Sequence, residues 1–99
     1  MPKSIEECLE KKGEHIVLHL KKNLGNAHFR YVLSEGKNVE GCVTYSVYAE
    51  YTDGKAHTVG GVPDFSDSRE LSESFCRLLA RTLATPLSLE AIYEDSLTP

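Results

Sequence analysis

Apolar and polar residues alternate along four stretches of the chain before Pro63, and this period of two predicts β-strands. The first stretch covers residues 14–21, the second 27–35 and the clearest 43–51. The fourth follows the turn after Tyr51. The residues predicted to face the core are Ile16, Leu18 and Leu20, then Phe29, Tyr31 and Leu33, and then Val43, Tyr45, Val47, Ala49 and Tyr51.

The dipeptide Asp53-Gly54 predicts a two-residue type I′ turn that joins the last two strands. Pro63 ends the second of them, because it has no N–H to donate to a ladder. The small residues on the returning strand leave room for a helix across the inner face. The cross-strand pairs predicted from this turn are Tyr51 with Ala56, Ala49 with Thr58, Val47 with Gly60, Tyr45 with Val62, and, on the solvated outer face, Glu50 with His57.

The pattern changes to helical spacing after Pro63. Ser66 or Asp67 is the predicted N-cap of a first helix, and Thr85-Pro86 begins a second. The predicted apolar stripes are Leu71, Phe75, Leu78, Leu79 and Thr82 in the first helix, and Leu89, Ile92, Tyr93 and Leu97 in the second. We therefore predict a single α+β domain over 1–99, an antiparallel β-meander of about four strands with two C-terminal helices packed on one face. Residues 1–13 form either a short helix from Ile5 or a loosely ordered segment.

The charge is divided unevenly along the chain. The net charge of −4 comes entirely from residues 51–99, which hold four basic and eight acidic side chains. Lys11, Lys12, Lys21 and Lys22 form a local basic cluster, but nucleic-acid binders need a broader basic face to displace phosphate counterions. We therefore expect no nucleic-acid partner.

Cys8, Cys42 and Cys76 make an odd, widely spaced set, which is a poor disulfide framework. Residues 1–12 are polar rather than signal-like, and no apolar run is long enough to span a membrane. These features predict a cytoplasmic protein with reduced thiols and no membrane partner.

Four short motifs are spread over residues 29–97: Tyr31-Val32-Leu33, Val43-Thr44-Tyr45-Ser46-Val47, Asp64-Phe65-Ser66-Asp67, and Leu87-Ser88-Leu89 with Glu94-Asp95. In these motifs the chain resembles a family of short bacterial proteins known only as a domain of unknown function. It departs from the family's Tyr-Gly-Ile at Tyr45-Ser46-Val47, and from an aliphatic residue at Phe65. The resemblance implies the architecture and no catalytic residue.

The residues that could carry chemistry fit structural roles better. His15 and His19 share a face of the predicted strand, but a strand separates them by about 13 Å, too far for one metal ion. Cys42 has no base nearby in the sequence to form a thiolate, and Cys76 lies mid-helix beside the apolar stripe, where a partly buried thiol is expected. Gly60-Gly61 lacks the Lys and Ser/Thr of a phosphate loop. We therefore predict no catalytic residue, metal or cofactor.

The acidic side chains Glu90, Glu94 and Asp95 are the predicted partner-facing surface. The favoured function is a non-catalytic interaction or regulatory module, with an unidentified protein partner or as a homo-oligomer through an edge strand or an exposed sheet face at Tyr48 and Val59. The alternative is a small-ligand-binding domain that uses space near Gly60 beneath the helices. A small enzyme ranks last.

Overall fold

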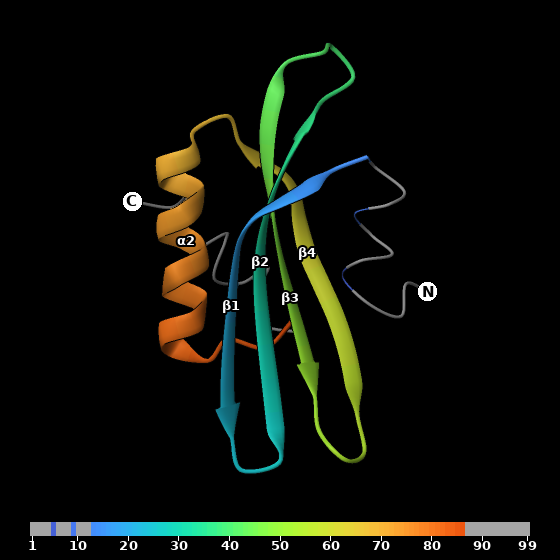
Figure 1. Ribbon diagram of the computed structural model, residues 1–99, viewed down its shortest axis with the longest axis vertical. Coiled ribbons are helices and arrows are strands. Elements are labelled where there is room, and N and C mark those ends of the chain that lie inside the picture. Colours follow the sequence, from blue (N-terminus) through green and yellow to red (C-terminus); the bar gives the residue numbers. More distant parts are fainter. Residues whose placement is uncertain (1–4, 6–8, 10–12, 87–99) are drawn as a thin grey trace.

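A computed structural model shows a four-stranded antiparallel sheet with one helix packed on it (Figure 1). The strands run in the order β1-β2-β3-β4, which confirms the predicted meander and the α+β class. Their bounds are β1 His15–Leu24, β2 Ala27–Lys37, β3 Val43–Thr52 and β4 His57–Ser66, and helix α2 covers Arg69–Thr82. The structure describes Ile5, Leu9 and residues 13–86, so the predicted second C-terminal helix lies outside the described residues.

The inner face of the sheet packs against α2, as the alternation of apolar residues predicts. Phe29, Tyr31 and Leu33 of β2 are buried there with Val47 and Ala49 of β3. The helix contributes Phe75, Cys76, Leu79 and Ala80 to the same core. This side buries the main apolar core of the protein.

The first helix begins later than predicted and presents a different stripe. Its N-cap is Ser68, whose hydroxyl accepts a hydrogen bond from the Leu71 amide, rather than Ser66 or Asp67. The buried side of the helix is centred near Cys76 and Leu79, about a quarter turn away from Leu71. Leu71 is therefore 63% exposed, and its predicted place in the core is wrong.

The hairpin between β3 and β4 also differs from the one predicted from the sequence. Its loop has four residues, because Thr52 pairs with His57, and neither Asp53 nor Gly54 has a positive φ. The Asp53 carboxylate accepts hydrogen bonds from the amides of Lys55 and Ala56. This Asx-type turn competes with the two-residue turn and shifts the register by two residues. The observed pairs are Tyr51 with Thr58, Ala49 with Gly60, and Val47 with Val62.

A β-bulge in β1 interrupts the predicted alternation. Ile16 pairs with Ser34 and Leu18 with Leu33, so Val17 is the extra residue. The strand therefore changes face at this point. Val17, Leu18 and Leu20 all pack towards the inner core, whereas Ile16 is 40% exposed.

The outer face of the sheet is covered as well. Ile5 and Leu9 have helical backbone and pack on Val32 and Tyr48. Tyr48 is only 5% exposed, and Val59 packs partly buried at the edge of this cluster. The outer face thus carries a second, smaller apolar core. The prediction of an open self-association face at Tyr48 and Val59 is wrong.

Candidate functional site

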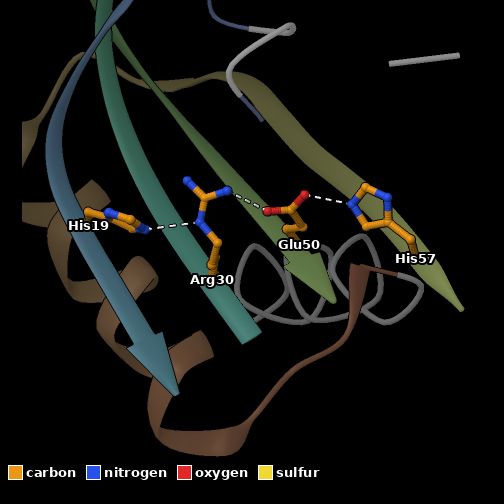
Figure 2. A network of polar contacts seen from close by, with 4 residues as sticks. All are labelled: His19, Arg30, Glu50 and His57. Carbon is orange, nitrogen blue, oxygen red and sulfur yellow. Dashed lines mark hydrogen bonds and ion pairs between the residues drawn. The ribbon is translucent and has the colours of Figure 1, made fainter. Parts of the chain in front are cut away.

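A row of charged and ring side chains crosses all four strands on the outer face (Figure 2). We call His19, Arg30, Glu50 and His57 the charged row. Arg30 and Glu50 lie directly opposite each other on β2 and β3. His19 and His57 extend the row to the two edge strands by diagonal contacts, and the predicted Glu50–His57 pair therefore forms in a different register.

The centre of the charged row is a buried carboxylate. Glu50 is 6% exposed, and its two oxygens accept from Arg30 Nη1 and contact His57 Nε2, each at 2.6 Å. The sequence predicted this pair to be solvated, but Glu50 is buried, whereas the His57 side chain is 39% exposed. A buried carboxylate held by a guanidinium and an imidazole is satisfied at both oxygens.

His19 closes the other end of the charged row. Its Nε2 accepts a hydrogen bond of 3.1 Å from Arg30 Nε, so this contact needs a neutral ring with the proton on Nδ1. A carboxylate-bound histidine such as His57 has the orientation of a general base. Within the described residues, however, the only side-chain hydrogen bond of His57 is to Glu50, and no hydroxyl or thiol nucleophile joins it.

A second polar cluster lies on the same face, towards the other end of the sheet. The Glu14 carboxylate accepts from the hydroxyls of Ser46 at 2.8 Å and Tyr48 at 2.7 Å. Asp64, at φ 50°, accepts from Thr44 at 2.7 Å and donates its amide to Ser46 at 2.9 Å. The sequence did not link these residues. The polar alternation of β3 is the only signal that pointed to them.

An open groove of about 540 Å³ separates β1 from the C-terminal half of α2. We call it the basic groove. Lys22, Arg77 and Arg81 supply three cations to its lining, and none of them has an ion-pair partner among the described residues. The remaining lining residues are Leu20, Asn23, Ala80 and Leu83.

Local structure explains why the cations converge there. Lys22 pairs with the core residue Phe29 and so points to the inner face, whereas Lys21 pairs with Arg30 on the outer face. Arg77 and Arg81 are four residues apart and so share a side of α2. The groove was missed from the sequence, because no local pattern joins position 22 to positions 77–81.

The histidines singled out in the sequence do not come together. Because of the bulge at Val17, His15 pairs with Glu35 on the inner face, and His19 lies on the outer face. His15 Nε2 is 3.7 Å from the Glu35 carboxylate. The predicted shared face is therefore wrong, and the described part of the chain holds no group of three metal-ligating side chains.

The two described cysteines differ in environment. Cys42 is exposed, and Cys76 is fully buried in the inner core. Burial raises the pKa of the Cys76 thiol to about 12, which keeps it protonated at neutral pH. Burial likewise raises the pKa of Tyr31 to about 12, and its hydroxyl donates to the Ala84 carbonyl at 2.7 Å.

The glycines at 60 and 61 have the packing role that the sequence favoured over a phosphate loop. A Cβ at Gly60 would lie 3.1 Å from Pro86 Cβ, and one at Gly61 would collide with the ring of Tyr48. Pro86 thus takes the space near Gly60 in which the sequence placed a ligand pocket. Cys8, Glu90, Glu94 and Asp95 lie outside the described residues.

No protein-family model matches the chain, and neither the curated proteins nor the solved structures contain a match. The resemblance over residues 29–97 therefore stays a prediction. In the part of the chain that the structure describes, no helix is long and apolar enough to cross a membrane.

Proposed function

We propose that this protein is a non-catalytic interaction module that binds an acidic segment of a partner protein in the basic groove. The observation that carries the proposal is the convergence of Lys22, Arg77 and Arg81 on one open groove. Cations that lack an ion-pair partner among the described residues attract a complementary surface, and such complementarity favours encounter and orientation. The apolar lining from Leu20 and Leu83 adds area that a partner side chain can bury.

The charged row and the Glu14 cluster support a structural role more than a binding role. Glu50 is buried, and both of its oxygens are occupied by side chains of the same chain. Glu14 is held in the same way by Ser46 and Tyr48. These groups fix the outer face, whereas the basic groove gathers three cations that have no ion-pair partner among the described residues. Bacterial origin and a cytoplasmic location stay predictions.

A small carboxylate-bearing ligand is the second candidate. The groove volume of about 540 Å³ lies within the range of small-molecule sites, about 300–1,000 Å³. Its site differs from the pocket predicted near Gly60. The length dependence of the affinity distinguishes the two candidates. If the groove binds a peptide, each added peptide residue that reaches the groove should raise the affinity. If it binds a small carboxylate, lengthening the molecule should leave the affinity unchanged.

The test is a titration of the full chain into a fluorescent peptide of about eight residues in which glutamate alternates with valine. We expect saturable binding that weakens with salt, because exposed ion pairs are screened. Replacing both groove arginines, Arg77→Ala with Arg81→Ala, should weaken binding about tenfold, at up to about 1 kcal/mol for each lost pair.

The matched control for that experiment is Arg69→Ala, on the same helix. Arg69 pairs with Glu73 and lies outside the groove, so its loss should change the affinity by less than about twofold. A lysine-for-glutamate version of the peptide should not bind. If wild-type protein bound neither peptide, or both equally, the proposal would be wrong.

A further inference from the structure

We propose that the acidic segment binds as an extended strand that pairs with the free edge of β1 and so adds a fifth strand to the sheet. This inference rests on the proposed function and specifies the conformation of the partner. Addition of a strand to an open edge is a recurrent mode of peptide recognition, in which main-chain hydrogen bonds provide affinity and alternate side chains provide specificity.

The β1 edge is regular over its second half. From Leu18 to Leu24 the strand pairs with β2 residue by residue, and none of the described strands occupies its other side. The bulge at Val17 lies before this stretch and does not interrupt it. His19 and residues 21–24 are exposed. Alternate residues of this stretch therefore offer backbone groups to a partner, over about 20 Å.

The opposite edge of the sheet is regular only in its first part. Strand β4 pairs residue by residue with β3 from His57 to Val62, and Pro63, which cannot donate to an added strand, follows with a register irregularity. Asp64 has a φ of 50°, which breaks the extended backbone. Irregular edges of this kind resist pairing with a further strand. Of the two described edges, only β1 combines a regular stretch with the basic groove at its side.

The basic groove lies beside this edge of the sheet. Leu20 and Lys22 line it from the inner side of β1, and Arg77 and Arg81 line it from α2. A strand beside β1 would present every second side chain to this groove. We therefore expect acidic residues at alternate positions, with their carboxylates directed towards α2.

The outer side of the β1 edge has fewer cations than the side that faces the basic groove. Lys21 lies on the outer face, so the intervening side chains of the added strand meet one lysine there instead of three cations. An acidic residue at every second position, all on the helix side, fits this distribution better than an acidic helix, which would present carboxylates at intervals of three or four residues.

The experiment uses backbone N-methylation of the alternating glutamate–valine peptide against the full chain. In a strand, alternate amides point to the same neighbour, so all glutamate amides face one way and all valine amides the other. One peptide is methylated at its glutamate amides and a second at its valine amides. We expect one of the two to lose more than about tenfold in affinity and the other less than about threefold.

Amide hydrogen exchange on the protein gives an independent readout. On addition of the unmethylated peptide, alternate amides between Leu18 and Leu24 should gain protection, because they acquire main-chain acceptors. Amides at the β4 edge should not change. Protection confined to the arginine-bearing part of α2, with β1 unchanged, would contradict strand addition.

The outcomes separate this inference from the function on which it rests. If the unmethylated peptide binds and the two methylated peptides behave alike, strand addition is wrong and the groove still binds acidic segments. If the unmethylated peptide does not bind, both proposals are wrong. If single-stranded oligothymidylate displaces the peptide at lower concentration, the ligand is a nucleic acid and a protein segment is excluded.

Discussion

The two faces of the sheet are both covered, yet they are buried by different chemistry. The inner face is an apolar core in which Tyr31, Leu33 and Leu79 are fully buried against α2. The outer face combines a small apolar cluster with the buried carboxylate Glu50 and the hydroxyl-held Glu14. The inner face is thus stabilised by apolar packing, and the outer face by a smaller apolar cluster together with paired polar groups. The three cations of the basic groove lie at the margin of the inner face, between β1 and α2.

The largest effect is expected from the inner face. Leu79→Ala should lower the free energy of unfolding by about 3 kcal/mol, because it opens a cavity at a fully buried position. The matched control is Leu71→Ala on the same helix, where the side chain is 63% exposed, with an expected change within about 0.5 kcal/mol. Urea denaturation measures both. Equal losses would mean that α2 packs through another face.

On the outer face, Glu50→Gln removes the charge and keeps the shape. We expect a loss of about 2 kcal/mol, since the partly buried Arg30 keeps its charge without a carboxylate partner. Glu73→Gln, at an exposed ion pair with Arg69, should cost less than about 0.5 kcal/mol. The comparison is made by denaturation at low salt. Indistinguishable results for the two variants would contradict a structural role for the charged row.

Two glycines of the β3–β4 hairpin, one packed on the outer face and one in the loop, give a third comparison. At Gly61 a Cβ would strike the Tyr48 ring and lie 3.0 Å from the Val47 carbonyl, so Gly61→Ala should cost about 1–2 kcal/mol. At Gly54, in the loop, a Cβ meets nothing within 4 Å, and Gly54→Ala should leave stability within about 0.5 kcal/mol. Thermal unfolding distinguishes them. A neutral Gly61→Ala would show that Tyr48 can move aside without cost.

Alkaline pH should lower the free energy of unfolding through the Cys76 thiol, which is buried in the inner core. The Cys76 thiol has a pKa of about 12 in the folded chain and an ordinary value of 9.0 when unfolded, so the unfolded chain releases this proton first. Its contribution is complete below pH 9 and is lost as the pH rises towards 12. Cys76→Ala should reduce the slope of stability against pH by up to about 1.4 kcal/mol per unit. An unchanged slope would mean that the thiol titrates alike in both states.

The sequence predicted the elements that depend on local pattern. The inward residues of β2, most of those of β3, and the helix after Pro63 follow from periodicity, and the structure confirms them. Val43, predicted to face the core, is 42% exposed, and β4 continues past the predicted stop at Pro63 to Ser66.

The sequence-based prediction failed where a local interaction or an extra residue changed the strand register. The Asp53 side chain caps the amides of Lys55 and Ala56 and lengthens the loop, and no periodic signal reveals the extra residue at Val17.

The candidate site was less predictable than the fold. Lys22 is separated from Arg77 by 55 positions in the sequence and meets it only because α2 crosses back over β1. Glu50 is buried although it lies on the face that the sequence placed in solvent. Charges on separate elements carry no shared period, so their convergence is visible only in three dimensions.

The most direct test of the basic groove uses the two neighbouring lysines of β1, because they have the same charge and lie on opposite faces. Binding of the alternating glutamate–valine peptide is measured for Lys22→Glu and Lys21→Glu in otherwise wild-type protein. We predict that Lys22→Glu weakens binding about tenfold, while Lys21→Glu weakens it less than about threefold, since only Lys22 lines the groove. Equal losses, or a larger loss for Lys21→Glu, would contradict the proposal that the acidic segment binds between β1 and α2.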